Sequence, residues 1–98
     1  MAYQIIVKKR FSNKIQKILV YLEKEWSHKV ATDFLLKIDR RIELLSRQPA
    51  IGAPSTIIKN VRGLLITRHN KIYYKIKGHK VIILNIYDTR MNPKKNPY

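Results

Sequence analysis

The segment VRGLLITRHNKIYYKIKGHKVIILNIY, residues 61–87, decides the fold of this chain. Its apolar residues recur with a period of about two, as in a β-strand whose side chains alternate between two faces. The polar pairs His69-Asn70 and Gly78-His79 interrupt this pattern at the positions of two tight turns. The predicted strands are Arg62–Arg68, Lys71–Lys77 and Lys80–Tyr87. Strands joined by such short turns form an antiparallel meander.

The middle strand of this meander has one apolar and one polar face. Its two faces are Ile72, Tyr74 and Ile76 on one side, and Tyr73, Lys75 and Lys77 on the other. We expect the first set to be buried and the second to face water. The last strand is apolar on both faces, which predicts an interior position in the sheet.

The N-terminal half of the chain is mainly helical. A short strand at Tyr3–Lys8 precedes it, and we expect Ser12 to cap the first helix. Apolar residues then recur at spacings of three and four, with a break around Ser27 and His28. The two apolar stripes are Ile15, Ile18, Leu19, Leu22 and Trp26, then Ala31, Phe34, Leu35, Ile38, Ile42 and Leu45. Two helices packed as a hairpin are therefore predicted.

Proline and glycine end the second helix. Pro49, Gly52 and Pro54 interrupt helical structure, and Ser55–Lys59 is expected to begin extended. The predicted fold class is α+β, in the order β-α-α-β-β-β, with the two-helix hairpin on one face of a small antiparallel sheet. All 98 residues form one domain, in which residues 91–98 are a tail interrupted by proline.

The charge of the chain is strongly unbalanced. It holds 21 Lys and Arg residues against six Asp and Glu, a formal net charge of +15. Such a surface is typical of proteins that meet a polyanion or an acidic partner. There is no cysteine, and the N-terminal apolar stretch is too short for a signal peptide or a membrane span. We therefore expect a cytoplasmic protein that does not bind membranes.

Familiar catalytic motifs are absent, and the open face of the sheet is the candidate site. The sequence has no Gly-rich phosphate loop, and its three histidines are too scattered to predict a metal site, so no metal or other cofactor is expected. Basic and phenolic side chains are expected to project from the meander: Lys59, Arg62, Arg68, Lys75, Lys77 and Arg90, with Tyr73 and Tyr87. Arginine binds phosphate through two nitrogens, and tyrosine stacks on unpaired bases. The combination suits single-stranded RNA, and it equally suits a protein partner.

Several of these residues have a structural interpretation as well. Arg68 is equally consistent with a solvated strand end, and His69 with a turn residue rather than a general base. Tyr74 is expected in the core. Tyr87 is equally consistent with a place in the core and with a place in the site. Asp88 and Arg90 are also consistent with an ion pair that orders the tail. Three further candidates lie on that tail: Lys94, Lys95 and Tyr98.

The chain resembles the RelE/ParE superfamily of type II toxin–antitoxin toxins. The resemblance rests on the β-α-α-β-β-β order and on three segments: LLSRQPAIGAPS, VRGLLITRHNKIYYKI and VIILNIYDTRMNP. It implies a growth-inhibiting toxin whose cognate antitoxin is acidic and amphipathic, and a complex of the two that binds operator DNA. RelE-like members cut messenger RNA on the ribosome, whereas ParE-like members inhibit DNA gyrase.

The resemblance favours a metal-independent, ribosome-dependent mRNA endoribonuclease and leaves two alternatives. These are a gyrase inhibitor and an inactive member that binds only antitoxin and operator DNA. In the nuclease, a ribose 2′-OH would attack its adjacent phosphate. Arg62, Arg68 and Arg90 would stabilise the developing charge, by about 3–4 kcal/mol for each well-placed donor. Tyr87 or Tyr98 would stack on the base or assist proton transfer. The RNA-binding set would be Lys59, Tyr73, Lys75, Lys77, Lys94 and Lys95.

Overall fold

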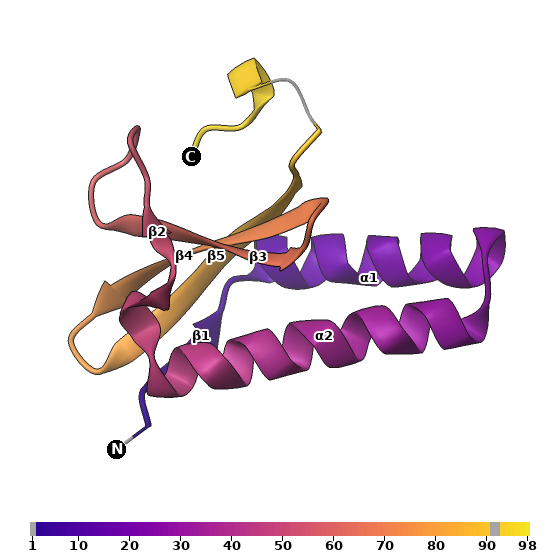
Figure 1. The fold of residues 1–98 in the computed structure, drawn as a ribbon, viewed down its shortest axis with the longest axis horizontal. Coiled ribbons are helices and arrows are strands. Elements are labelled where there is room, and N and C mark those ends of the chain that lie inside the picture. Colours follow the sequence, from indigo (N-terminus) through magenta and orange to yellow (C-terminus); the bar gives the residue numbers. More distant parts are fainter. Residues whose placement is uncertain (1, 91–92) are drawn as a thin grey trace.

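The computed structural model describes residues 2–90 and 93–98 as two helices packed on a five-stranded sheet. The elements are β1 (Gln4–Val7), α1 (Lys9–Glu25), α2 (His28–Arg47), the 3₁₀ helix η1 (Pro49–Ile51), β2 (Ala53–Pro54), β3 (Val61–Thr67), β4 (Asn70–Lys77), β5 (Lys80–Asp88) and the 3₁₀ helix η2 (Pro93–Lys95). Figure 1 shows α1 and α2 side by side on one side of the sheet, with the turn between them beyond the sheet and the C-terminal segment on the opposite side. None of the described helices has the length and apolar character needed to cross a membrane.

The two helices form the predicted hairpin, but α1 begins earlier than expected. Ser12 was expected to cap it, yet the N-cap is Lys8, and the Ser12 N–H already donates to the Lys8 carbonyl at 3.2 Å. Ser27 does cap α2, since its hydroxyl accepts the Val30 N–H at 3.1 Å. The break predicted around Ser27 is thus the end of one helix and the capped start of the next.

The sheet has the order β1-β5-β4-β3-β2 and is mixed rather than wholly antiparallel. The predicted meander β3-β4-β5 is present, and β5 is interior as expected. The difference lies in β1, which pairs with β5 in parallel. The helical hairpin connects β1 to the far edge of the sheet, so β1 lies along the free edge of β5, an arrangement that alternation of residues does not reveal.

The strand that precedes the meander is shorter than expected. Extended structure was predicted at Ser55–Lys59, but β2 contains only Ala53 and Pro54. The Ser55 hydroxyl instead accepts the backbone N–H groups of Ile57 and Ile58, each at 3.1 Å. These local hydrogen bonds compete with pairing to β3 and fold the segment into a turn. The first meander turn also lies one residue earlier than predicted, because Asn70 already belongs to β4.

The core lies between the helices and one face of the sheet. Buried residues of the two helices pack against those of the central strands: Phe11, Ile15, Phe34, Ile38 and Leu45 against Ile66, Ile72, Tyr74, Val81, Ile83 and Ile86. Tyr74 is completely buried, as the alternation of β4 predicts. Its neighbour Tyr73 points to the opposite face of the sheet, because successive strand residues alternate.

A β-bulge separates the two halves of the β4–β5 pair. Tyr73 lies opposite Asn85 and Tyr74 lies opposite Ile83, so Leu84 has no partner of its own on β4. A bulge of this kind bends the strand and changes which residues of the following segment point to each face. Beyond it, Tyr87 lies opposite Lys71 and points to the open face.

Tyr74 also anchors the loop that follows α2. Its hydroxyl donates to the Pro49 carbonyl at 2.6 Å and accepts the Gly52 N–H at 2.9 Å. A Cβ at Gly52 would lie 2.5 Å from this hydroxyl oxygen, so the approach requires glycine. Burial raises the pKa of Tyr74, although the Gly52 N–H and the nearby Arg62 act in the opposite direction.

Candidate functional site

The open face of the sheet carries tyrosines and lysines and is partly covered by the end of the chain. Lys71, Tyr73, Lys75 and Tyr87 point to this face according to the strand register. Residues 94–98, which we call the tail strap, lie on the same side of the sheet in Figure 1. Of the predicted tail, residues 91 and 92 lie outside the described residues. The strap shows that this face is not simply open to water.

Three tyrosine rings meet where the tail strap contacts the open face of the sheet. The Tyr98 ring stacks on Tyr73 with centroids 4.9 Å apart and planes at 17°. The Tyr87 ring lies 6.2 Å from Tyr73 and 5.8 Å from Tyr98. Tyr73 is therefore only 7% exposed although it faces away from the helices. Tyr87 and Tyr98 were alternatives for one functional role, and both belong to this cluster.

Polar contacts hold the tail strap at two points. The Asn96 side chain donates from Nδ2 to the Tyr73 hydroxyl at 3.0 Å. The Ser55 hydroxyl donates to the backbone carbonyl of Tyr98 at 2.5 Å, while it accepts the two N–H groups of its own turn. Among the described residues, the contacts of the strap thus include the stack on Tyr73, the Tyr87 ring, and these two hydrogen bonds to the loop and to β4.

Lys14 joins the cluster from α1 and was not among the predicted residues. Its ammonium lies 3.6 Å from the centre of the Tyr87 ring and donates to the Ile86 carbonyl at 3.2 Å. Burial lowers the pKa of Lys14, and the nearby Arg10 lowers it further. The contact holds a cation on the face of an aromatic ring and also satisfies a strand-edge carbonyl.

Asn85 protects the same edge of β5, beyond the residues that pair with β1. Its side chain is completely buried, accepts the Ile86 N–H at 2.9 Å and donates to the Tyr87 hydroxyl at 3.4 Å. Beyond the end of β1, both backbone groups of Ile86 therefore bind side chains, Asn85 at the N–H and Lys14 at the carbonyl. An edge protected in this way resists pairing with another strand.

Arg62 points to the helix side of the sheet rather than to the open face. It lies opposite the buried Tyr74, and its Nη1 donates to the carbonyls of Gly52 at 2.8 Å and Ala50 at 3.3 Å. The guanidinium thus binds the same loop that Tyr74 anchors. In this position Arg62 orders the chain after α2.

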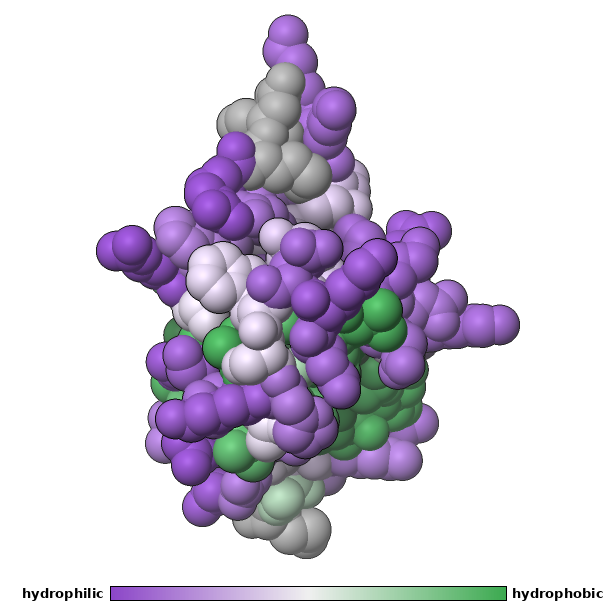
Figure 2. All heavy atoms as spheres, turned by 90° about the vertical axis from the view of Figure 1, so that its right-hand side faces the viewer, coloured by the Kyte–Doolittle hydropathy of each residue, from purple (hydrophilic) through white to green (hydrophobic). Residues whose placement is uncertain are grey.

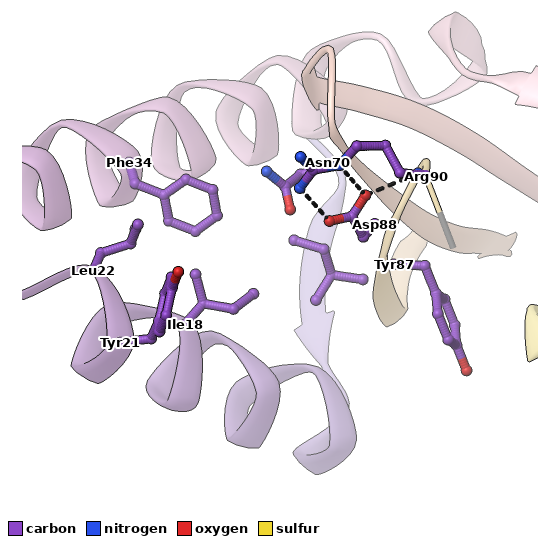
Figure 3. Close-up of a pocket in the computed structure, with 9 residues that line it drawn as sticks. Ile18, Tyr21, Leu22, Phe34, Asn70, Tyr87, Asp88 and Arg90 are labelled. Carbon is purple, nitrogen blue, oxygen red and sulfur yellow. Dashed lines mark hydrogen bonds and ion pairs between the residues drawn. The ribbon is translucent and has the colours of Figure 1, made fainter. Parts of the chain in front are cut away.

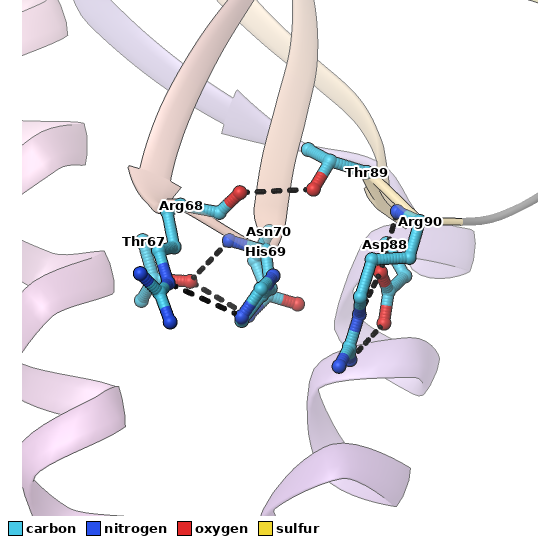
Figure 4. A network of polar contacts seen from close by, with 7 residues as sticks. All are labelled: Thr67, Arg68, His69, Asn70, Asp88, Thr89 and Arg90. Atoms are coloured by element: carbon cyan, nitrogen blue, oxygen red, sulfur yellow. Dashed lines mark hydrogen bonds and ion pairs between the residues drawn. The ribbon is translucent and has the colours of Figure 1, made fainter.

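Arg68 lies at the turn between β3 and β4, where backbone contacts connect the turn to the end of β5. Its Nε donates to the His69 ring at 3.3 Å, and its carbonyl accepts the Thr89 hydroxyl at 2.9 Å. The Thr89 N–H also donates to the His69 carbonyl at 2.9 Å. Figure 4 shows this network beside the Asp88–Arg90 pair. Arg68 and Arg90 therefore lie at the same end of the sheet.

Asp88 and Arg90 form an ion pair. The Arg90 guanidinium contacts the carboxylate at 2.7 Å and 3.0 Å, and the Arg90 N–H donates to it at 2.8 Å. Hydrogen bonds from the Arg90 side chain and backbone lower the pKa of Asp88 to about 2. This geometry supports the interpretation of Asp88 and Arg90 as an ion pair.

The four predicted catalytic residues do not gather in one place. Arg62 and Arg68 lie at opposite ends of β3, and six residues of strand span about 20 Å. Arg68 and Arg90 share one end of the sheet, whereas the Tyr87 ring turns toward Lys14 and the tail strap. Figure 3 shows the Tyr87 ring directed away from Asp88 and Arg90.

The predicted phosphate-binding residues are also spread out. Lys75 and Lys77 share the open face with Tyr73, whereas Lys59 lies on the exposed loop before β3. Lys94 and Lys95 belong to η2 and are exposed. The structure thus brings together Tyr73, Lys75 and Lys77 on β4, and leaves the other lysines on separate segments.

A second surface is an apolar notch between the hairpin and the end of the sheet. It encloses about 290 Å³. The residues around it are Ile18, Tyr21, Leu22, Phe34, Asn70, Ile86, Tyr87, Asp88 and Arg90. Figure 3 shows Ile18, Tyr21 and Leu22 from α1 facing Phe34 from α2, with the Asp88–Arg90 pair at one side.

The hairpin tip extends this apolar surface into solvent. Trp26 is 70% exposed, and Val20 and Tyr21 are each 57% exposed. Figure 2 looks at this side of the molecule and shows several hydrophobic and pale areas, with hydrophilic side chains between and around them. Large exposed aromatic residues of this kind are typical of protein-binding surfaces.

Sequence reasoning missed Lys14, Asn85 and the hairpin tip. A signal for Lys14 exists, because it lies three residues after Phe11 and four before Ile18, beside the apolar stripe of α1. Asn85 is the one polar residue within the apolar run VIILNIY. Within the described part of the chain, no three side chains of His, Cys, Asp or Glu lie close enough together to hold a metal ion.

Comparison with protein families identifies the family of this chain. Residues 5–93 match the family described as the ParE toxin of the type II toxin–antitoxin system parDE. This range contains both helices and the whole meander. A comparison with curated proteins gives no match.

Solved structures share the fold at low sequence identity. A chain of the chromosomal ParDE toxin–antitoxin system from P. aeruginosa is 18% identical with a TM-score of 0.76, and the match covers 89% of this chain and 96% of that one. The toxin–antitoxin complex RelBE2 from Mycobacterium tuberculosis contains a chain that is 14% identical, with a TM-score of 0.62 and coverage of 90% and 99%. A chain of the YoeB dimer from Staphylococcus aureus is 10% identical, with a TM-score of 0.63 and coverage of 89% and 97%.

Proposed function

We propose that this chain, which belongs to the ParE toxin family of type II toxin–antitoxin systems, arrests growth by binding a protein target, DNA gyrase. The chain is a toxin of the RelE/ParE superfamily, whose members differ in their targets. The choice of gyrase follows the ParE-like branch. The choice of binding over RNA cleavage rests on the geometry of the arginines.

The observation that carries the proposal is the separation of the guanidinium groups. Phosphoryl transfer requires several donors within hydrogen-bond distance of one phosphate group. Arg62 instead binds the Gly52 and Ala50 carbonyls, and Arg90 binds Asp88. Arg62 and Arg68 are about 20 Å apart along β3, and the Arg62 guanidinium is directed at the Gly52 loop, which argues against their contacting one phosphate together.

The exposed hairpin tip supports a protein target. Trp26 and Tyr21 are aromatic residues with most of their surface in water. Exposed Trp and Tyr side chains often dominate the binding energy of protein interfaces. The adjoining notch, with Phe34 in its wall, is large enough for a few aliphatic side chains of a partner.

The chain also needs a partner that balances its charge. With a net charge of +15, an acidic and amphipathic antitoxin is the partner that the toxin class predicts. Operator DNA would be bound by the toxin–antitoxin complex. We place this protein in the cytoplasm, where gyrase and the antitoxin are found.

A purified gyrase assay tests the proposal directly. The protein should inhibit supercoiling, and Trp26→Ala should weaken the inhibition at least about tenfold, as for a residue that dominates an interface. Lys24→Ala, at an exposed position in the last turn of α1 and two residues before Trp26, is the matched control. Since Trp26 is exposed, circular dichroism should show an unchanged fold. Supercoiling that continues at saturating protein would refute the gyrase proposal.

The second candidate is ribosome-dependent cleavage of messenger RNA, favoured by Tyr73, Lys75 and Lys77 on the open face. Pulse labelling after induced expression distinguishes the two. If the protein acts on gyrase, DNA synthesis should fall before protein synthesis. If it cuts messenger RNA, protein synthesis should fall first, cut transcripts should accumulate, and Arg68→Ala should abolish both effects.

A further inference from the structure

The first half of α1 and the residue before it form a surface of one charge sign. We call this surface the cationic patch, and its members are Lys8, Lys9, Arg10, Lys14 and Lys17. Four of them are exposed, and Lys14 is half-buried. The first acidic residue of the sequence is Glu23, so no carboxylate lies among them along the helix. Within the described part of the chain, the ion pairs involve other residues than these five.

The patch consists of a row of cations with a hollow at one end. Arg10, Lys14 and Lys17 follow one another at spacings of four and three residues, so they lie on one face of α1. They span about 10 Å along the helix axis. The hollow encloses about 350 Å³ at the start of this row. The residues that line it are Lys8, Lys9, Arg10, Leu84 and Tyr98.

The cations of the patch repel one another. Burial lowers the pKa of Lys14, and the nearby Arg10 lowers it further. Like charges held together in this way cost free energy, which a bound polyanion would offset. Lys24, later in α1, differs because Glu23 and Glu25 flank it in the sequence. The uniform charge therefore ends before the hairpin tip.

The surroundings of the patch favour a duplex over a single strand. Proteins that bind single strands stack unpaired bases on aromatic side chains. Beside the patch, the Tyr87 ring already holds the Lys14 ammonium at 3.6 Å, and the Tyr73 ring is stacked on Tyr98. Duplex DNA needs no such ring and presents about one charge for each 1.7 Å of its axis, or about six along 10 Å. Its major groove also admits an α-helix, whereas that of duplex RNA is too narrow.

We propose that the cationic patch binds the phosphate backbone of duplex DNA without reading its sequence. The preference for DNA over duplex RNA rests in part on the proposed function, since gyrase acts on DNA. In Figure 1, α1 begins beside the sheet and ends beyond it. Arg10 and Trp26 are about 24 Å apart along its axis. One molecule can therefore contact an enzyme through the hairpin tip and the enzyme's DNA through the patch.

Fluorescence anisotropy with a labelled DNA duplex, without gyrase, tests the patch on the full-length protein. The triple variant Lys9→Ala, Arg10→Ala and Lys17→Ala should bind at least about thirtyfold more weakly at about 100 mM salt. The slope of log K against log salt should become shallower by about 2–3, or about one for each lost phosphate contact. The matched control is the triple variant Lys29→Ala, Lys37→Ala and Arg40→Ala, at exposed positions of α2. It removes the same charge but should weaken binding less than about threefold.

Competition by unlabelled polyanions then tests the chemistry of the partner. A DNA duplex of unrelated sequence should displace the label as well as the original duplex does. Single-stranded DNA and polyglutamate, at the same concentration of charge, should compete at least about tenfold less well because their charges are less dense. Duplex RNA should also compete less well, since its major groove does not admit the helix.

Three results would overturn the inference. A wild-type Kd weaker than about 100 µM would mean that the protein does not bind DNA. Equal losses in the two triple variants would show that net charge, rather than the patch, causes binding. Equal competition by single-stranded DNA, duplex RNA or polyglutamate would contradict the preference for duplex DNA.

The fold and the gyrase proposal are checked separately. Circular dichroism should show an unchanged fold in both triple variants, because all six positions are exposed. The single variants Arg10→Ala and Lys17→Ala give a second measure, since each should make the salt slope shallower by about one. Because binding is measured without gyrase, its failure is distinct from a failure of the supercoiling assay, which tests the hairpin tip.

Discussion

Replacing Tyr74 by Phe should destabilise the protein far more than the loss of one oxygen atom suggests. The hydroxyl donates to the Pro49 carbonyl and accepts the Gly52 N–H. Gly52 is buried, so its N–H would lose its partner without access to water, which costs about 1–3 kcal/mol. Pro49 is half-buried, so its carbonyl can bind water instead, and the loss of its hydrogen bond from Tyr74 adds less than about 1 kcal/mol.

The expected decrease in the free energy of unfolding is therefore about 2–3 kcal/mol. For a domain of this size it corresponds to a fall in Tm of roughly 10–20 °C. Urea and thermal unfolding followed by circular dichroism would measure both quantities. Tyr73→Phe is the matched control, because the partner of its hydroxyl among the described residues is Asn96 of the tail strap, and its effect should stay below about 1 kcal/mol. A loss of less than about 0.5 kcal/mol for Tyr74→Phe would refute the anchoring role.

A double substitution extends this test to Arg62. Arg62 binds the carbonyl of Gly52, and Tyr74 binds the N–H of the same residue. If both hold one loop, the effects of Arg62→Met and Tyr74→Phe should not add, with a coupling of at least about 0.5 kcal/mol. Additive effects would mean that Arg62 does not order the loop, and would free its guanidinium for another role.

Three further perturbations test other parts of the structure. Arg90→Gln should raise the pKa of Asp88 from about 2 toward its ordinary value, measured by NMR titration of the carboxyl group, and an unchanged midpoint would contradict the ion pair. Since the folded pKa is depressed, the stability that the pair contributes is present above the unfolded pKa and is lost as the pH falls toward 2. Gly52→Ala should lower the free energy of unfolding by more than about 2 kcal/mol in urea, because the new Cβ meets the Tyr74 hydroxyl at 2.5 Å and the Gly63 carbonyl at 2.9 Å. Ser27→Ala should lower it by about 1 kcal/mol through the lost cap of α2, and no change would show that the cap is dispensable.

The periodicity of the sequence was sufficient to predict the two helices and the meander. Both rest on burial of one face of each element, and the alternation that placed Tyr74 in the core is a local property of β4. The direction of β1 relative to β5 was not predictable in this way, because a short apolar strand carries no signal for its pairing direction.

The positions of the candidate site residues depended on register, which periodicity does not determine. Arg62 was expected on the open face, yet it pairs with the buried Tyr74 and so points to the opposite side. The β3–β4 pair contains a register shift between Leu65 and Thr67, and a shift of one residue reverses the faces of a strand. Because this register shift lies between Arg62 and Arg68, simple alternation does not predict which face Arg68 shares with Arg62.

Contacts that bring distant segments together were beyond sequence reasoning for a different reason. The tail strap is separated from Tyr73 by more than twenty residues, and its place depends on Ser55 and Asn96 as well as on the ring. Lys14 lies on a helix and its ring partner Tyr87 on a strand. Each residue alone is consistent with an ordinary solvated surface.

The two candidate activities concern opposite sides of one small sheet. The apolar notch and the hairpin tip lie on the side of the helices, whereas Tyr73, Lys75 and Lys77 lie on the other. Substitutions at Trp26 and Lys75 are therefore too far apart to share contacts, and their effects on stability should be independent. A toxin that acts only through the hairpin tip would keep its activity when the open face is altered, and a nuclease would keep its activity when Trp26 is replaced. The separation of the two surfaces thus allows one set of variants to distinguish the two mechanisms.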